Sequence, residues 1–404
     1  MPRLVQVASV PSLAVRQAFG ARAITWPLVG PLRLAGPNLD APPPGPGWQR
    51  LTMRLAGICG SDVAALSGRS PTVLWPLVSF PSVPGHEIVA DLAPDAGDGS
   101  GGRVVVDPYL SCQARGVAPC PECARGQSAV CRRAAMSGET LGGMMIGYHR
   151  DLPGGWSDHL WAHRSQLHPL PPDLSDEAAL LVEPVSIAAH AVLQVPWQGS
   201  ERVLVVGGGT IGLATVAALR LLALPAPLVA TRHGHQAAAA AALGGHPVVA
   251  DGARWPRLGG ATPVLGWLGR PLWLGGFDVV VDAVGTDATF ARAAAAVRAG
   301  GTVLRVGDIG TLPRSRDGGI WAPDVRVLSP YGYGLDRLPD GTTGHTFDLV
   351  LARIGTLAEP LAALVTHIYG LGDYRAALAA ATHHARFRSI KVAFRGPAAT
   401  TRAH

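Results

Sequence analysis

The sequence predicts an α/β protein in which one domain contains a doubly wound parallel sheet and another is an irregular β domain. The chain has 404 residues, enough for two to three domains. Apolar residues make up 48% of it and charged residues 15%, so a buried core is expected. Before about Pro171 the chain consists of short segments interrupted by proline and glycine. After it, the sequence predicts alternating strands and helices, the pattern of βαβ units.

The first domain is predicted over residues 1–175, where apolar runs of strand length occur. Those runs are 51–58, 88–92 and 104–106. Residues 176–321 are predicted to form the parallel sheet, and residues 322–404 to return to the first domain. The expected strands of the sheet are 202–206, 227–231, 277–282 and 302–306, and the expected helices run to 222, over 236–243 and over 288–299.

The charge pattern excludes some classes of partner. The 34 basic residues exceed the 28 acidic ones and include a single lysine, but they form no stripe interleaved with aromatic residues, so we expect no nucleic-acid binding. The apolar run 203–219 contains four glycines, and we expect no membrane span. The acid-free residues 1–39 resemble a transit peptide loosely, yet an irregular extension is the simpler interpretation, and we expect a cytoplasmic protein.

Four of the five cysteines form the pattern C-x7-C-x2-C-x7-C in a segment rich in proline, glycine and arginine, about 110–132. Four thiolates close a tetrahedron around zinc at about 2.3 Å and leave no position open for chemistry. The pattern therefore predicts a structural zinc site, although a disulfide or two idle cysteine pairs remain alternatives. The predicted ligands are Cys112, Cys120, Cys123 and Cys131.

A G-x-G-x-x-G motif follows an apolar strand and precedes a helix, as in the Rossmann dinucleotide-binding turn. Gly207 permits the tight turn, Gly209 lets the backbone approach a pyrophosphate, and Gly212 allows the helix to pack on the sheet. A tight turn that binds no phosphate is the alternative. The predicted cofactor residues of this turn are Gly207, Gly208, Gly209, Thr210, Ile211 and Gly212.

The acidic residue that would hold the ribose of NAD is missing about 20 residues after the motif. The second strand ends in Thr231 and Arg232, a neutral residue and an arginine. A carboxylate would repel a 2′-phosphate and an arginine would attract it, so the sequence favours NADP over NAD. Arg232 could instead only cap an exposed strand end.

Two further strings carry candidate ligands, GICGSD with Cys59 and PGHE with His86. Together with EPVSIAAHAVL, VVGGGTIG and DAVG, they give a chain that resembles the zinc-dependent medium-chain dehydrogenase/reductase family, which includes alcohol, sorbitol and threonine dehydrogenases. The likeness extends over about residues 32–394. It implies that the irregular β domain is a GroES-like barrel that carries the catalytic groups.

The resemblance implies a catalytic zinc bound by Cys59, His86 and Glu183, with Glu87 entering or leaving the coordination sphere. Glu183 replaces the third-ligand cysteine of ordinary alcohol dehydrogenases and could ligate through a water. By the same resemblance, Asp62 supports His86 and Ser61 removes the substrate proton. Two cofactor contacts are also implied, Val284 in DAVG and Lys391 at the pyrophosphate, although Lys391 could instead be an exposed strand residue.

Three departures from the family limit this transfer. Cys112 lies five residues farther from Cys120 than is usual, so an insertion must loop out before Cys112 can ligate. Ala64 stands where many relatives have a relay histidine, so proton release must use water or another group. His190 lies on an apolar helix and is interpreted as a packing residue.

The leading hypothesis is a zinc- and NAD(P)-dependent dehydrogenase acting on a secondary alcohol or polyol, or on the corresponding carbonyl. A second is a specialised NADPH-dependent reductase of a carbonyl, imine or conjugated double bond in a biosynthetic pathway. A third is a non-enzymatic binding protein that keeps the zinc lobe. The family suggests a homodimer or homotetramer, and the expected partner is a small alcohol or carbonyl molecule.

Overall fold

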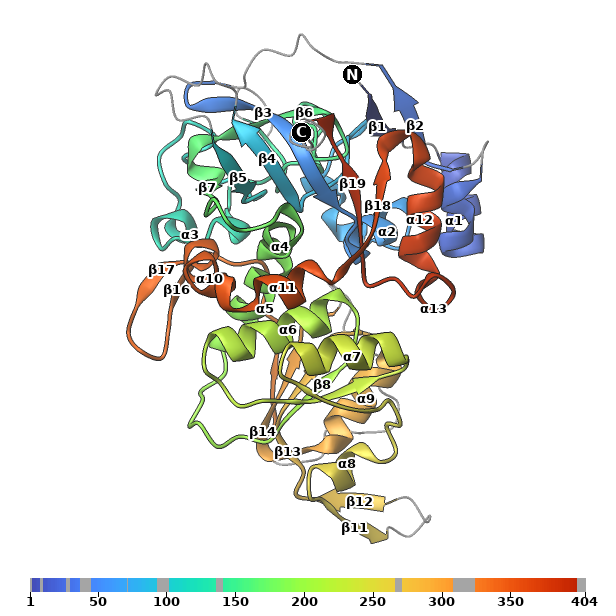
Figure 1. The fold of residues 1–404 in the computed structure, drawn as a ribbon, viewed down its shortest axis with the longest axis vertical. Helices are drawn as coiled ribbons and strands as arrows, with labels where there is room; N and C mark the ends of the chain where they lie inside the picture. Colours follow the sequence, from blue (N-terminus) through green and yellow to red (C-terminus); the bar gives the residue numbers. More distant parts are fainter. Residues whose placement is uncertain are drawn as a thin grey trace. The chain divides into compact units, whose positions relative to one another are not determined.

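The computed structural model describes residues 2–7, 10–26, 30–36, 45–70, 72–92, 102–135, 141–265, 271–307 and 324–397. The chain divides into two compact units. Unit 1 comprises Met1–Glu183 and Ala362–His404, and unit 2 comprises Pro184–Leu361 (Figure 1). Each unit is described by itself.

Unit 1 is built on a seven-stranded sheet with the order β18-β19-β3-β4-β5-β7, in which β6 also pairs with β3. Strands β18 and β19 are parallel, and the other pairs are antiparallel. The strands are β3 (Trp48–Gly57), β4 (Ile88–Leu92), β5 (Arg103–Val106), β6 (His159–His163), β7 (Leu167–Pro169), β18 (Val365–Gly370) and β19 (Lys391–Arg395). The predicted runs 51–58, 88–92 and 104–106 are thus strands β3, β4 and β5, and the C-terminal β18 and β19 complete their sheet.

The core of unit 1 includes Leu51, Met53, Trp156 and Phe394, all nearly inaccessible to solvent. The ring of Trp156 meets that of Phe394 edge to face at 5.2 Å, so the core joins the two chain segments that make up unit 1. A separate antiparallel pair is formed by β1 (Arg3–Gln6) and β2 (Leu32–Ala35). The helices of unit 1 are α1 (Val10–Phe19), α2 (Gly60–Leu66), α3 (Pro121–Ala124), α4 (Asp176–Leu180), α12 (Tyr374–Thr382) and α13 (His384–Phe387).

Unit 2 contains a six-stranded parallel sheet with the order β10-β9-β8-β13-β14-β15. In chain order this is 3-2-1-4-5-6, the doubly wound Rossmann arrangement predicted from the sequence. The strands are β8 (Val203–Val206), β9 (Leu228–Thr231), β10 (His246–Val249), β13 (Phe277–Asp282), β14 (Val297–Arg305) and β15 (Arg326–Leu328). The central β8 is buried along its whole length, as expected for a parallel strand covered on both faces.

Helices α6, α7 and α9 pack on strands β8, β9 and β13 of this sheet (Figure 1). The core includes Val280, Phe277, Phe290 and Trp255. Two antiparallel hairpins are added, β11 (Thr262–Leu265) with β12 (Pro271–Leu274), and β16 (Leu335–Arg337) with β17 (Thr343–His345). The helices are α6 (Thr210–Leu221), α7 (Gly234–Ala242), α8 (Trp255–Leu258), α9 (Asp287–Ala296) and α10 (Thr346–Ile354), while α5 (Val182–Leu193) and α11 (Ala358–Ala362) cross the unit boundaries.

The unit boundaries differ from those expected at residues 175 and 321. Residues 176–183 remain in unit 1, because Asp176 of α4 accepts hydrogen bonds from Arg54 of β3 and Arg103 of β5 at 2.7 and 2.8 Å. Residues 324–361 remain in unit 2, because β15 pairs with β14 and α10 packs on α6. The expected boundary at 321 lies in 308–323, outside the described residues.

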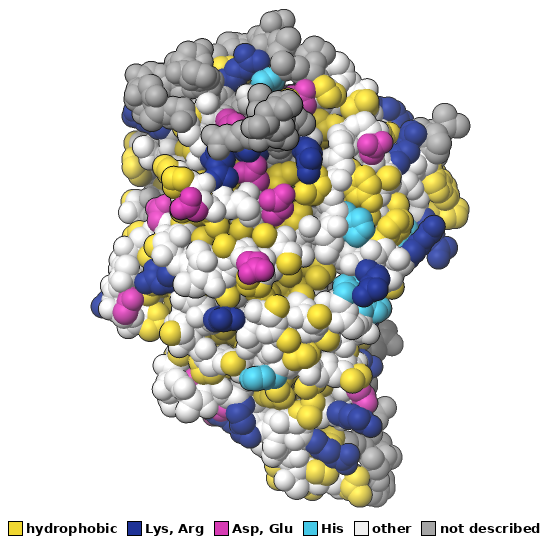
Figure 2. Space-filling view, viewed as in Figure 1, with side chains coloured by type: hydrophobic (Ala, Val, Ile, Leu, Met, Phe, Trp, Pro, Cys, Tyr) yellow, Lys and Arg dark blue, Asp and Glu magenta, His cyan; other side chains and the backbone are white. Residues whose placement is uncertain are grey.

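Within the described ranges, no helix has both the length and the hydropathy to cross a membrane. On the face drawn in Figure 2, basic and acidic side chains are interspersed with apolar ones rather than collected by sign.

Candidate active site

The first turn of α2 carries three of the residues singled out in GICGSD. Cys59 precedes the helix as its N-cap, and its backbone N–H donates to Asp62 Oδ2 at 2.9 Å. A carboxylate in the first turn of a helix satisfies an otherwise free N–H and faces the positive end of the helix. This local bond fixes Cys59, Ser61 and Asp62 as one rigid turn.

His86 is brought to this turn by the PGHE segment just before β4. Gly85 has a φ of +97°, and a Cβ there would lie 2.4 Å from Trp156 Cδ1, so only glycine fits. The Nδ1 atom of His86 lies 3.3 Å from Asp62 Oδ1, and its Nε2 atom lies 3.5 Å from Ser61 Oγ. The Cys59 thiol is also within hydrogen-bonding reach of the imidazole. The structure thus brings Cys59, Ser61 and His86 together from two segments.

The pKa of His86 reflects two opposing influences, its burial and its contacts with Asp62 and Cys59. Burial alone would lower the pKa of His86, but the Asp62 carboxylate and the Cys59 group outweigh burial and raise that pKa well above its ordinary value. The carboxylate facing Nδ1 also fixes the ring orientation and directs Nε2 toward Ser61.

Tyr148 belongs to the same cluster and was not found from the sequence. Its ring centroid lies 5.8 Å from that of His86, and its hydroxyl interacts with the Ser61 side chain. Burial and the nearby Asp62 carboxylate raise the pKa of Tyr148, so the phenol is neutral. The only sequence signal is a tyrosine after a Gly-Met-Met-Ile-Gly segment, which carries no known spacing rule.

Glu183 lies in the first turn of α5 and is buried. Burial raises the pKa of Glu183 to about 8, with His86 and Lys391 acting in the opposite direction and Glu87 in the same direction as burial. No three of Cys59, His86, Glu87 and Glu183 have ligand atoms that all lie within 4.8 Å of one another. Glu183 is therefore near the cluster, but its carboxylate is not placed to share one ion with Cys59 and His86.

Glu87 and Lys391 form a buried ion pair that neither sequence interpretation anticipated. Lys391 Nζ donates to Glu87 Oε1 and Oε2 at 2.6 and 2.7 Å, and each side chain is 1% exposed. Although burial alone would lower the pKa of Lys391, the Glu87 carboxylate raises it. The alternative of an exposed lysine is wrong. The charge of Lys391 is directed at Glu87, and both Glu87 oxygens are occupied by this pair rather than free for a metal.

Backbone packing fixes the position of this pair. A Cβ at Gly57 would lie 1.8 Å from Glu87 Oε2, so the first glycine of GICGSD makes room for the carboxylate. Lys391 Nζ also lies 3.4 Å from the Ile58 carbonyl, next to Cys59. The pair therefore joins β19 to the segment that carries Cys59.

The residues around His86 fit a zinc ion in their chemistry. A thiol, an imidazole and a carboxylate are the donors that zinc accepts in catalytic sites. Asp62 Oδ1 and His86 Nδ1 are buried and make no well-formed hydrogen bond, yet they face each other as in a carboxylate–histidine–metal arrangement. Direct ligation by Glu183 would need its side chain to move, whereas a water could bridge it to the ion.

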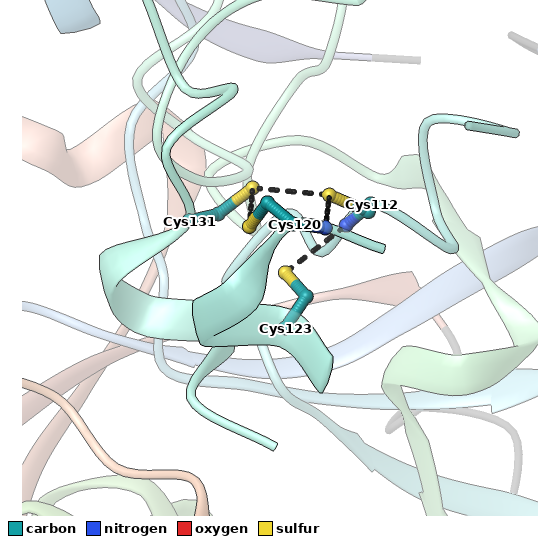
Figure 3. A group of neighbouring side chains, drawn as sticks. All are labelled: Cys112, Cys120, Cys123 and Cys131. Carbon is teal, nitrogen blue, oxygen red and sulfur yellow. Dashed lines mark hydrogen bonds between the residues drawn. The ribbon is translucent and has the colours of Figure 1, made fainter. Parts of the chain in front are cut away.

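The four cysteines of the C-x7-C-x2-C-x7-C pattern converge in unit 1 (Figure 3). All four sulfur atoms lie within 4.8 Å of one another, and no disulfide links them. Cys112 Sγ lies 3.6 Å from Cys131 Sγ, and Cys120 Sγ lies 4.0 Å from it. Tetrahedral zinc–sulfur bonds of about 2.3 Å place sulfur atoms about 3.8 Å apart. The cluster therefore fits one zinc ion, and the disulfide alternative is wrong for these residues.

The insertion after Cys112 loops out and is anchored by Arg115. The buried guanidinium donates to the Leu110 and Gly143 carbonyls at 3.0 and 2.7 Å and also to the Leu141 carbonyl. Trp48 Nε1 donates to the Ala114 carbonyl at 3.2 Å. These bonds hold the inserted residues in a loop beside the cysteine cluster, so the insertion does not move Cys112 away from the other thiols.

Backbone N–H groups prepare the thiols for a metal. Cys112 N donates to Cys123 Sγ at 3.4 Å, and Cys120 N donates to Cys112 Sγ at 3.3 Å. Burial would raise the pKa of Cys120, but the backbone N–H groups of Cys123 and Arg132 lower it to about 6. Burial and the neighbouring sulfur atoms raise the pKa of Cys123. Without a metal, crowding keeps that thiol protonated.

The glycine turn of unit 2 has the geometry that its motif predicts. Gly207 has a φ of +111°, and α6 begins at Thr210 with Gly209 as its N-cap. A Cβ at Gly212 would lie 1.9 Å from the Gly207 carbonyl oxygen, which confirms that Gly212 permits close packing of helix on strand. A Cβ at Gly209 would meet no atom within 4 Å, so the N-terminus of α6 has open space in front of it.

The end of β9 adjoins this turn. A Cβ at Gly208 would lie 2.9 Å from Thr231 Cγ2, and Thr231 is buried while Arg232 is exposed. Val284, which is 39% exposed, lies over Gly207, where a Cβ would be 2.7 Å from Val284 Cγ2. Thr231 and Val284 therefore adjoin the turn, and Arg232 directly follows Thr231 at the end of β9.

His190 is buried in unit 2, as a packing residue should be, but it is also paired. Its Nδ1 atom lies 3.0 and 2.9 Å from the two Asp336 oxygens, and Thr346 Oγ1 donates to Asp336 Oδ2 at 2.6 Å. These bonds tie the hairpin of β16 and β17 to α5. The residue therefore has a structural partner, which the apolar sequence around it did not indicate.

Comparisons with known proteins agree with this architecture. Residues 45–172 match the alcohol dehydrogenase GroES-like domain. L-galactonate-5-dehydrogenase of Escherichia coli (strain K12) is 34% identical over 192 residues, 46% of this chain and 50% of that protein. Sorbitol dehydrogenase of Arabidopsis thaliana is 26% identical over 361 residues, 87% of this chain and 90% of that protein.

Among solved structures, the rspB alcohol dehydrogenase of Escherichia coli CFT073 complexed with NADH superposes with a TM-score of 0.67. It is 22% identical and the match covers 90% of this chain and 96% of that one, which shows a common fold. The chain spans about half the length of the first curated relatives that it matches, 45 to 51%. Residues 45–172 thus match an alcohol dehydrogenase GroES-like domain, and the chain is similar to relatives named as dehydrogenases of a sugar acid and a polyol.

Proposed function

We propose that the chain is a zinc-dependent oxidoreductase that transfers a hydride between a nicotinamide cofactor and a secondary alcohol or polyol, or the corresponding carbonyl. The observation that carries the proposal is the convergence of Cys59, Ser61 and His86 on the first turn of α2, with Asp62 behind the imidazole. Two of the relatives are named as dehydrogenases of L-galactonate and of sorbitol, and these names support a polyol-like substrate.

In the proposed mechanism, Cys59 and His86 would hold a zinc ion, and Glu183 would reach it directly or through a water. When bound, this ion supplies Lewis acidity toward the alcohol oxygen. The hydroxyl of Ser61 would accept the proton from the substrate hydroxyl while passing its own proton on to water, and Asp62 would keep the His86 imidazole in one orientation. A bound nicotinamide would supply the hydride acceptor for the carbinol carbon or, in the reverse direction, the hydride donor for the carbonyl.

The cofactor is proposed to bind with its pyrophosphate at the N-terminus of α6, against Gly209, where the backbone leaves open space. Arg232 supports NADP over NAD, because an exposed guanidinium stands at the end of β9 where a carboxylate would hold the ribose of NAD. Replacing Arg232 by alanine should weaken NADPH binding at least tenfold and leave NADH binding within about twofold.

A second zinc ion is proposed for the four cysteines, where it would have no open position and would stabilise the fold. We also propose that the chain assembles into a homodimer or homotetramer, which sedimentation would test.

The test combines metal analysis with a turnover screen of alcohols and carbonyls using NADP(H) and NAD(H). We expect two zinc ions per chain and turnover with NADP(H). Ser61→Ala should lower kcat about 100-fold at unchanged zinc content, because it removes the proton acceptor and no ligand. Ser70→Ala, a serine beyond the end of α2, is the control. Full activity in Ser61→Ala, or an active metal-free chain, contradicts the proposal.

A further inference from the structure

Residues 10–25, which precede the matched residues 45–172, fold onto the helix that carries the proposed site. Helix α1 (Val10–Phe19) is followed by a 3-10 turn (Gly20–Thr25), and that turn contacts α2 and α12. Ala23 and Ile24 of the turn are fully buried, so the segment is an integral part of unit 1.

Arg16 of α1 is the polar link between this segment and α2. Its side chain is buried, with 3% exposure, and Nη1 donates to the Leu66 carbonyl at 2.6 Å. Its Nε atom donates to the Ser12 carbonyl at 3.1 Å, which holds the guanidinium against its own helix. Leu66 is the last residue of α2, where carbonyl groups lack partners within the helix and a cation is favourable.

Packing at the next residues shows how closely α1 adheres. Gly68 has a φ of +70°, and a Cβ there would lie 2.7 Å from Leu13 Cδ1 and 3.2 Å from Gln17 Cγ. Gln17 Nε2 also lies 3.4 Å from the Gly68 carbonyl. The turn that ends α2 therefore has two polar bonds and a close apolar contact with α1.

The opposite end of α2 holds the residues of the proposed reaction. Cys59 caps the helix, and Asp62 binds the Cys59 N–H and faces His86. A helix of seven residues is only about 10 Å long and moves as one body. A displacement at Leu66 is therefore transmitted to Ser61 and Asp62.

We propose that Arg16 is a positioning residue that fixes α2, and through it Ser61 and Asp62, relative to His86. The catalytic consequence rests on the proposed function, whereas the effect on α2 does not. A misplacement of about 1 Å can cost 100-fold in rate, so a bond at the far end of so short a helix matters for turnover.

The test uses the full chain with three substitutions. Arg16→Met keeps most of the side-chain volume and removes the donors, and Arg16→Lys keeps one donor. Arg22→Met is the matched control, because Arg22 is an exposed arginine on the adjoining 3-10 turn. Hydrogen exchange is measured at the amides of Val63, Ser67 and Arg69, which donate to carbonyls within or just before α2. The melting temperature, kcat and KM are measured in parallel.

We expect the α2 amides of Arg16→Met to exchange at least tenfold faster, because a buried hydrogen bond from a charged group is lost. We expect kcat to fall about tenfold at unchanged KM, with Arg16→Lys intermediate and Arg22→Met like the wild type. If Arg16→Met does not fold, Arg16→Lys decides by the same two measurements.

Two results overturn the inference. One is α2 exchange at the wild-type rate in the Arg16 variants. The other is a lower melting temperature with kcat unchanged, which would make Arg16 structural only. If the wild type turns over no alcohol or carbonyl, the proposed function fails by itself, and the exchange rates still decide whether Arg16 holds α2.

Discussion

Alanine at Gly209 and at Gly212 should separate cofactor binding from folding within one turn. At Gly212 the new Cβ would lie 1.9 Å from the Gly207 carbonyl oxygen, and real Cβ contacts are essentially never below 3.0 Å. Helix α6 or the Gly207 turn must therefore shift by at least about 1 Å, an overpacking that costs about 3 kcal/mol of unfolding free energy. Gly212→Ala should lower the melting temperature by roughly 6–12 °C and weaken cofactor binding as well.

At Gly209 the Cβ would meet no atom within 4 Å, and the backbone φ of −80° suits alanine. Gly209→Ala should therefore keep its stability within about 0.5 kcal/mol. Its cofactor affinity should fall at least tenfold, because the methyl group occupies the space in front of the helix N-terminus where the pyrophosphate is expected. The assays are thermal unfolding without cofactor and titration of nucleotide fluorescence.

Gly355→Ala is the matched control for both substitutions. Gly355 also lies in unit 2, has a φ of −53°, and offers a Cβ position with no atom within 4 Å. Wild-type affinity in Gly209→Ala would refute a pyrophosphate against this turn. Wild-type stability in Gly212→Ala would refute the packing argument.

Three further outcomes are expected. Lys391→Met leaves the Glu87 carboxylate buried and unpaired, and should lower the unfolding free energy by about 3–5 kcal/mol. The double variant Lys391→Met with Glu87→Gln should recover most of that loss. Denaturant midpoints that show no recovery in the double variant contradict the pairing. In metal-free protein the Glu183 carboxyl has a pKa of about 8 against an ordinary 4.5, so the unfolded chain releases its proton first and stability falls as pH rises from about 4.5 to 8. Glu183→Gln should remove that fall, and equal melting-temperature slopes for the two proteins between pH 5 and 8 contradict this cause. Cys112→Ser should lose one zinc ion per chain and melt like chelator-treated wild type, and a chain whose melting is unchanged by chelator contradicts a structural metal.

The parallel sheet was predictable because its signals are local. Strands β8, β9 and β13 are short apolar runs that are each followed by a helix, and Gly207 marks the turn between the first of them and its helix. The strands observed at Val203–Val206 and Leu228–Thr231 agree with the predicted segments to within a residue. A strand that is buried on both faces is a nearly continuous run of apolar residues, and such a run can be recognised from the sequence alone.

The contacts that the sequence did not reveal join segments far apart in the chain. Lys391 and Glu87 are 304 residues apart, and each on its own is typical of an exposed position. Tyr148 reaches Ser61 and His86 from a loop with no regular pattern. The hydrogen bonds of Arg115 explain why the insertion after Cys112 does not disrupt the cysteine cluster. The carbonyl groups that accept them are brought to Arg115 by the fold of the loop, and no spacing of residues in the sequence predicts them. Tertiary pairing of charged and polar side chains is what single-sequence reasoning lacks.

The burial of Lys391 has a practical consequence for labelling, since the 404 residues contain no other lysine. Amine-directed reagents such as succinimidyl esters should find only the terminal amino group while the chain is folded. A second label, on the peptide that contains Lys391, would then mark molecules in which Lys391 has become exposed. The rate at which this label is incorporated therefore measures how often unit 1 unfolds around Lys391.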